Sequence, residues 1–225
     1  MSSLSSTKVA KNLFFSFAGQ MVYLLLGFVQ RTVFIHTLGT EYLGVNGLFS
    51  NILTLLNLAE LGVGNAIIFN LYKPVAQNDH QKIQQLIRFY SKAYQLITLV
   101  VLVVSVSIMP FLTFFMNGTP NISENIYLVY FLYVINTLSS YFYAYKRTMI
   151  MVEQDQYLIS NVTTLFGIAA MLLQAVLLFL FHKFLLFLLV QILLNYGQGL
   201  CIKILADKKY PVSKISRDRN PQNTL

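Results

Sequence analysis

Two ionisable side chains lie inside long apolar stretches of this sequence. Arg31 follows "MVYLLLGFVQ", and Glu60 lies within "LNLAELGVGNAIIF". An ionisable residue at the centre of a membrane-spanning helix costs about 2.5–3.5 kcal/mol on insertion scales, and more if it is dry and without a partner. Arg31 and Glu60 lower this cost either by forming a buried structural ion pair or by facing water. Both interpretations are open from the sequence.

Residue combinations that perform covalent or metal chemistry are absent from the sequence. It has no metal-ligand cluster, no nucleophile elbow, no glycine-rich phosphate loop and no paired carboxylates at useful spacing. His36, His80 and His182 lie in different predicted loops or helix ends, which argues against a shared metal site. The single cysteine, Cys201, excludes an intramolecular disulfide and a cysteine-based metal site. We therefore expect no enzyme, no metal and no cofactor.

The elements that must position these residues have the composition of membrane helices. Hydrophobic residues make up 56% of the 225 residues and charged residues only 11%, whereas soluble domains carry about 25% charged residues. Because about 20 apolar residues cross the hydrocarbon core as a helix, six segments qualify as spans: 12–36, 44–71, 91–116, 125–145, 157–181 and 184–206. The predicted fold class is an all-α integral membrane protein with one six-helix bundle in residues 1–206. Residues 207–225 form a predicted hydrophilic tail.

The distribution of lysine and arginine predicts the orientation in the membrane. The formal net charge is +8, and fourteen of the 16 basic residues fall on one side of the predicted membrane. Lys183 lies on the other side, and Arg31 lies within a span. Since Lys and Arg are retained in the cytoplasm during insertion, both termini are predicted to be cytoplasmic. Topology thus accounts for the basic charge, and we do not expect a nucleic acid as partner.

Polar residues recur on one face of four predicted spans. At 100° per residue, the polar stripe of the second span runs from Asn46 to Gly64 and includes Glu60, and that of the first span includes Arg31. Single polar residues commonly form hydrogen bonds between membrane helices. Stripes on several helices, together with an arginine and a glutamate, favour a hydrated cavity. The candidate binding residues are Arg31, Glu60, Gln20, Asn57, Asn136 and Asn195.

The run from residue 31 to residue 76 contains the turn "LGTEYLG", the segment "LAELGVGNA" and then "LYKP". It resembles the N-terminal part of bacterial polysaccharide flippases, the O-antigen and capsule type of the multidrug/oligosaccharidyl-lipid/polysaccharide superfamily. The later "YVINTLSSYFYAYKRTMI" is similar too. The resemblance implies a multi-pass carrier of the bacterial inner membrane that moves undecaprenyl-pyrophosphate-linked oligosaccharide from the cytoplasmic to the outer leaflet. In such carriers, two bundles alternate access around a central cationic cavity, commonly with an ion gradient.

The resemblance also implies roles for the candidate residues and for partners. Arg31 would contact the pyrophosphate, since a guanidinium binds phosphate oxygens in a fork and stays charged. Glu60 would be its counter-ion, or a site for a coupling ion or a proton. The implied partners are the lipid bilayer and the lipid-linked oligosaccharide. Family members have 12–14 spans in two halves, and alternating access needs both bundles. A six-span chain would pair with a second copy or another polypeptide, or be a truncated product.

Three other functions compete with the flippase interpretation. A drug/cation antiporter of the same superfamily would need an acidic, aromatic cavity, which Arg31 disfavours. A membrane enzyme of glycan assembly is disfavoured because no outward-facing loop exceeds about nine residues and such enzymes present their chemistry on larger extramembrane segments. A non-functional truncated remnant is the third alternative.

Overall fold

Helices account for the regular structure of the part of the chain that the structure describes. The structure is a computed structural model that describes the backbone of residues 2–116 and 120–211, and the side chains of residues 20–57, 64–116 and 120–211. The helices are α1 (Ser2–Leu38), α2 (Thr40–Ala76), α3 (His80–Ile108), η1 (Met109–Phe111), α4 (Leu112–Phe115), α5 (Ile126–Tyr141), α6 (Ala144–Val152), α7 (Gln156–Phe181) and α8 (Phe184–Lys209). No strand occurs in these residues, so the all-α prediction is confirmed for them.

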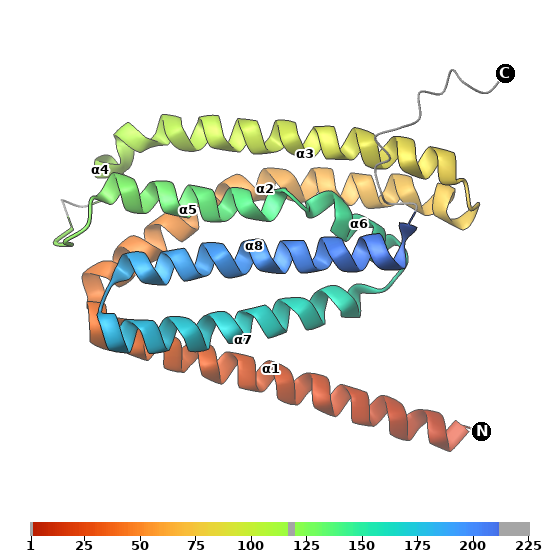
Figure 1. Cartoon of the computed structure of the whole chain (residues 1–225), viewed down its shortest axis with the longest axis horizontal. Helices are drawn as coiled ribbons and strands as arrows, with labels where there is room; N and C mark the ends of the chain where they lie inside the picture. Colours follow the sequence, from red (N-terminus) through yellow and green to blue (C-terminus); the bar gives the residue numbers. More distant parts are fainter. Residues whose placement is uncertain (1, 117–119, 212–225) are drawn as a thin grey trace.

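The long helices run back and forth along one axis. In Figure 1, α1, α7, α8, α5 and α3 follow one another across the molecule, and α2 lies behind α5. Helix α1 packs mainly along α7, and α2 packs mainly along α3. The helices α1 and α2 meet near their connection and diverge toward the other end of the molecule (Figure 1). This arrangement leaves an open arc of helices with α1 and α2 at its two ends.

Short connections reverse the chain at both ends of the molecule. Gly39 alone joins α1 to α2 and has φ 93°, a conformation that glycine adopts without steric cost. His182 and Lys183 join α7 to α8 at the same end, as predicted. At the opposite end, Asp79 caps the start of α3, and its side chain accepts a hydrogen bond of 3.0 Å from the Lys82 backbone N–H. Helix α1 begins and α8 ends at this second end (Figure 1).

The helix bounds differ from the predicted spans at several places. The predicted span 91–116 is divided between the end of α3, η1 and α4. The predicted polar connection 72–90 is mostly helical, because α2 continues to Ala76 and α3 begins at His80. Apolar runs mark the part of a helix that matches lipid, and a helix continues past that part wherever its backbone hydrogen bonds allow. The predicted span 125–145 consists of two helices, since α5 ends at Tyr141 and α6 begins at Ala144.

Five segments are long and apolar enough to cross a membrane by length and composition. They are Gln20–Leu38, His80–Phe115, Ile126–Val152, Gln156–Phe181 and Phe184–Lys209. The predicted span 44–71 belongs to α2, in which the side chains of residues 58–63 are outside the described part, so these five segments are those of the described residues. Large hydrophobic side chains are widely exposed on the surface. The chain is therefore a multi-pass membrane protein by its composition and helix lengths.

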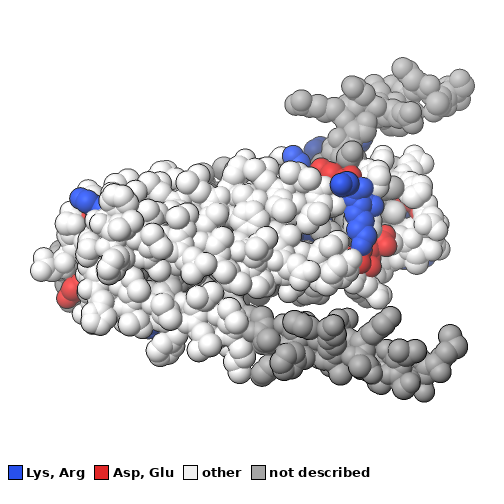
Figure 2. Space-filling view, turned by 60° about the horizontal axis from the view of Figure 1, so that its bottom comes forward, with Lys and Arg blue, Asp and Glu red and all other residues white. Residues whose placement is uncertain are grey.

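Charged residues concentrate toward the ends of the helices. Figure 2 shows Lys, Arg, Asp and Glu together near one end of this face, with a broad uncharged surface beside them. Two ion pairs, Lys146–Asp207 and Lys209–Asp155, join helices or helix ends near the end of α8. A charge-free belt between polar ends is the surface that a bilayer requires.

Candidate functional site

Polar side chains link each helix to its neighbour along the arc from α2 to α1. At the α2 end, the Tyr133 hydroxyl of α5 donates to Asn46 Oδ1. The Tyr141 hydroxyl, also on α5, donates to Asn57 Oδ1 of α2. All these groups lie among apolar side chains, where a hydrogen bond compensates the cost of burying a polar group.

The next link joins α5 to α8 through two of the candidate residues. Asn195 Nδ2 of α8 donates to Asn136 Oδ1 of α5 at 2.8 Å. Both side chains are half-buried, so each amide also keeps some exposed surface. The structure thus brings Asn136 and Asn195 together and joins Asn57 to Tyr141, whereas Arg31 lies in another part of the arc.

Gln174 completes the arc by joining three helices. This side chain of α7 is 1% exposed. Its Nε2 donates to Gln191 Oε1 at 2.9 Å and to the Phe187 carbonyl at 3.0 Å, both on α8. Its Oε1 accepts a hydrogen bond from Gln30 Nε2 of α1. Gln174 therefore fixes the position of the α1 segment that carries the next residue, Arg31.

Arg31 lines a cavity of about 310 Å³ between α1, α2 and α8. Gln30 and Asn46 contribute amides to its wall, and Phe34 and Phe187 form an apolar side. Gly27 and Gly47 also line it and place no side chain in the space. The rings of Phe34 and Phe187 meet edge to face, with centroids 5.1 Å apart. Among the described side chains, no carboxylate lines this cavity, and Arg31 is the charged residue in its wall.

A second cavity, of about 500 Å³, lies along α1 beside α7 and also includes Arg31 and Gly27. Its wall is mainly apolar and includes Leu24, Phe28 and Met171. Arg31 is exposed, and none of the ion pairs among the described side chains includes it. Arg31 therefore borders both a partly polar and an apolar cavity.

Two candidates, Glu60 and Gln20, have no described side chain in the walls of these cavities. The Glu60 backbone is helical within α2, and its side chain is outside the described residues. The part of α2 beside Arg31 includes Leu43 and Gly47. Glu60 follows Gly47 by more than three helical turns, roughly 20 Å along the axis. Gln20 is exposed on α1 and lines neither cavity.

Sequence analysis missed three polar residues that the structure brings into the arc. Gln30 is adjacent to Arg31, and Gln174 is a lone amide within "AAMLLQAVLLFLF". Both positions in the sequence indicate a polar group that needs a partner inside an apolar helix. Tyr141 was not selected because an aromatic ring fits an apolar helix face without a polar partner. Which amide meets which depends on the packing of helices far apart in the chain, and periodicity alone does not specify it.

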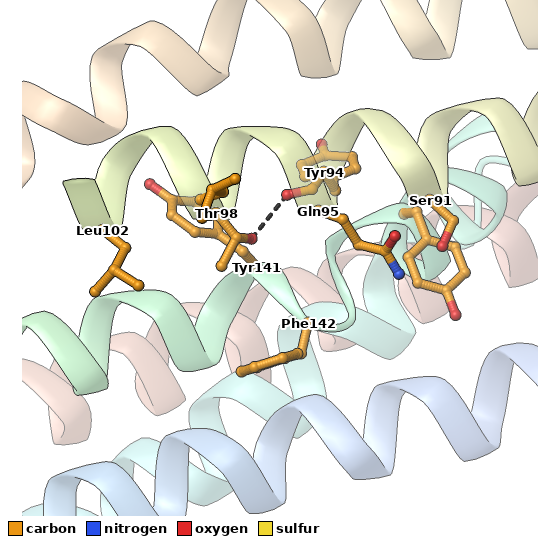
Figure 3. Close-up of a pocket in the computed structure, with 9 residues that line it drawn as sticks. Ser91, Tyr94, Gln95, Thr98, Leu102, Tyr141 and Phe142 are labelled. Atoms are coloured by element: carbon orange, nitrogen blue, oxygen red, sulfur yellow. Dashed lines mark hydrogen bonds between the residues drawn. The ribbon is translucent and has the colours of Figure 1, made fainter. Parts of the chain in front are cut away.

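A third cavity, of about 380 Å³, lies between α3 and the junction of α5 and α6. Figure 3 shows Gln95, Thr98 and Leu102 of α3 on one side and Tyr141 and Phe142 on the other. No described lysine, arginine or carboxylate lines it. It is separate from the two cavities that include Arg31.

The ion pairs near the end of α8 stabilise the end of the molecule opposite Gly39. Lys146 of α6 is buried and pairs with Asp207 of α8. Asp155 precedes α7, and hydrogen bonds from Lys209 and then from Tyr210 lower its pKa below the usual value of 3.8. Burial, followed by the hydrogen bond to Asp155, raises the pKa of Tyr210 to about 12. This end is the one that the lysine and arginine distribution predicts to be cytoplasmic.

Comparison with known proteins gave one family. The family model described as "Polysaccharide biosynthesis protein" matches residues 9–222 of the chain. The match covers α1 from residue 9 onward, all later described helices and both cavities that include Arg31. No curated protein and no solved structure matched the chain in the corresponding comparisons.

Proposed function

Because the chain belongs to the polysaccharide biosynthesis protein family, whose members are transporters rather than enzymes, we propose that it moves undecaprenyl-pyrophosphate-linked oligosaccharide across the bacterial cytoplasmic membrane. The family match confirms the resemblance drawn from the residues around "LAELGVGNA". The proposed movement is from the cytoplasmic to the outer leaflet.

The observation that carries the proposal is the position of Arg31. A permanent cation inside a membrane helix persists when water, a partner or a ligand meets its charge. Arg31 borders a cavity with two amides in its wall, and no described carboxylate lines that cavity. A pyrophosphate would supply the missing negative charge and accept two parallel hydrogen bonds from the guanidinium. The amides of Gln30 and Asn46 would contact neighbouring polar groups of the substrate.

The proposed architecture is a bundle of six spans with both ends in the cytoplasm. The N-terminal end of α1 and the C-terminal end of α8 lie at the same end of the molecule (Figure 1), which supports an even number of membrane crossings. The hydrogen-bonded arc ends in α1 and α2, which diverge. Alternating access requires a second bundle to move against this one. We propose that this second bundle closes the gap between α1 and α2.

Substitution of Arg31 tests the proposal. In cells that depend on this transporter, with the second bundle present, Arg31→Ala is expected to abolish surface polysaccharide while the protein level is unchanged. Arg31→Lys is expected to keep part of the export, since it keeps the charge and loses the fork geometry. Lys208→Ala, which removes the same charge from an exposed position at the end of α8, is the matched control and should export normally.

Two outcomes would contradict the substrate contact. Normal export by a well-expressed Arg31→Ala protein would exclude it. A structural ion pair predicts instead that Arg31→Ala lowers the amount of folded protein and that adding Glu60→Gln restores it. Quantifying membrane-inserted protein beside the exported polysaccharide separates these cases.

A further inference from the structure

The two cavities that include Arg31 differ in what surrounds them. The smaller cavity lies between α1, α2 and α8 and has the amides of Gln30 and Asn46 in its wall. The larger cavity lies between α1 and α7, and Leu24, Phe28, Ile35 and Met171 are among its lining residues. A partly polar and an apolar compartment therefore meet at Arg31.

The larger cavity opens toward lipid. Phe28 is 76% exposed and Leu24 is 58% exposed. Both belong to the segment Gln20–Leu38, which is apolar enough to cross the membrane. A surface of this kind within a membrane span faces acyl chains. A molecule with an apolar chain, an anionic linker and a polar group would match the order of surfaces from Phe28 through Arg31 to Gln30.

We propose that the larger cavity binds the isoprenoid segment next to the pyrophosphate of the lipid-linked substrate. This inference rests on the proposed function and adds a site for the chain of the substrate. Cavities of a few hundred Å³ hold drug-sized molecules, so about 500 Å³ accommodates a short segment of a long polyprenyl chain. The rest of the chain extends into the bilayer past Phe28. Arg31 holds the pyrophosphate at the inner end of that segment.

Gly27 controls the size of both compartments, because it lines each of them. A methyl group at this position would lie 3.6 Å from Met171 Cε, an ordinary contact. A larger side chain would occupy the space between α1 and Met171. Gly27→Leu and Met171→Trp therefore reduce the proposed chain site from its two opposite walls.

Photocrosslinking tests the proposal with the full chain in lipid nanodiscs. The probe is polyprenyl pyrophosphate without sugar, carrying a diazirine on the isoprene units nearest the pyrophosphate. The comparison probe is the corresponding polyprenol, which carries the same diazirine and no charge. We expect the first probe to label peptides with Phe28, Ile35 and Met171 at least fivefold more than the second. Arg31→Gln should weaken its binding about tenfold or more, as for the loss of a charge-assisted hydrogen bond.

Substitutions in the apolar wall test where the chain lies. Met171→Trp and Gly27→Leu should each reduce this labelling severalfold. Leu165→Trp adds the same bulk to an exposed position of α7, at 66% exposure, and should leave labelling unchanged. The chain has no other tryptophan, so fluorescence of each tryptophan variant checks its folding. Gly27→Leu provides a second test if the Met171→Trp protein does not fold.

Three results would overturn the chain site. They are equal labelling by both probes, labelling centred on the cavity of Figure 3, and labelling that neither wall substitution reduces. If Arg31-dependent binding persists in any of these cases, the chain site is wrong and the proposed function stands. If Arg31→Gln binds the probe as tightly as the unchanged protein, the substrate contact of the proposed function fails as well.

Discussion

Gln174 shows how one residue can determine the position of another. Its amide is buried and forms hydrogen bonds with Gln30, Gln191 and the Phe187 carbonyl. Arg31, one residue after Gln30, is exposed at the wall of two cavities. Arg31 is thus available to a ligand, and Gln174 orients α1, the helix that carries Arg31. Arg31 was the stronger signal in the sequence, because a charge in an apolar run is less common than an amide.

We predict that Gln174→Leu lowers the stability of the bundle by about 1–3 kcal/mol. Hydrogen bonds between membrane helices contribute about 0.6 kcal/mol on average and up to about 1.7 kcal/mol, and this substitution removes three. Gln198→Leu removes the single 3.2 Å bond to Thr163 and is the control. Thermal unfolding of both proteins in detergent measures the difference. Equal unfolding temperatures for the two variants would contradict the central role of Gln174.

Close approach of helices depends on small residues at two positions. A Cβ at Gly167 of α7 would lie 2.7 Å from Tyr23 Cε2 of α1, and one at Gly199 of α8 would lie 2.7 Å from Tyr143 Cδ2. Small residues at helix crossings are typical of membrane bundles. The existence of the long helices was predictable from apolar runs, since lipid dictates their length. The break at Phe142 and Tyr143 was not, because no proline or glycine interrupts "YFYAYK".

Gly167→Ala is expected to loosen the contact between α1 and α7. The methyl group would displace the Tyr23 ring, and overpacking of this kind costs about 1–3 kcal/mol. Gly44→Ala is the matched control, since a Cβ there meets nothing within 4 Å. It should be neutral or slightly stabilising because alanine favours the helix. Unfolding temperatures that fall equally in both variants would show that the Tyr23 contact is not the cause.

The contact between the start of α7 and the end of α8 has a predictable pH dependence. The pKa of Asp155 is lowered by its hydrogen bonds from Lys209 and Tyr210. The stabilisation is therefore fully present above the usual carboxyl pKa of 3.8 and is lost as the pH falls through the lower pKa of the folded protein. We expect the difference in unfolding temperature between the natural protein and Asp155→Asn to be constant from about pH 5 to 8 and to shrink below about pH 4. A difference that shrinks already between pH 8 and 6 would contradict this assignment.

The whole molecule has two chemically different ends. Gly39, His182 and Lys183 lie at one end, and the ion pairs Lys146–Asp207 and Lys209–Asp155 lie at the other. The excess of basic residues at the second end was visible in the sequence because the positive-inside rule counts residues and requires no packing information. The order of helices along the arc was not visible, since it depends on contacts between distant segments.

Reporter fusions test the orientation of the whole molecule. Fusions at Asn121 and His182 are expected to report the outer side, and fusions at Asp79, Gln154 and Arg217 the cytoplasmic side. The reason is the retention of lysine and arginine in the cytoplasm during insertion. Paired reporters, one active outside and the other inside, provide the control at each position. A cytoplasmic signal at Asn121 would overturn the six-span topology.

The hydrogen bond between Gln30 and Gln174 also has a consequence for biosynthesis. The two residues are separated by 144 positions in the chain. At 5–20 residues per second, the ribosome makes Gln174 roughly 7–30 s after Gln30. During that interval α1 is made before the helix that it packs against, and its amide must be hydrated or held by an insertion factor. The Arg31 segment therefore reaches its final position late, and substitutions in α7 affect the yield of inserted protein as well as its stability.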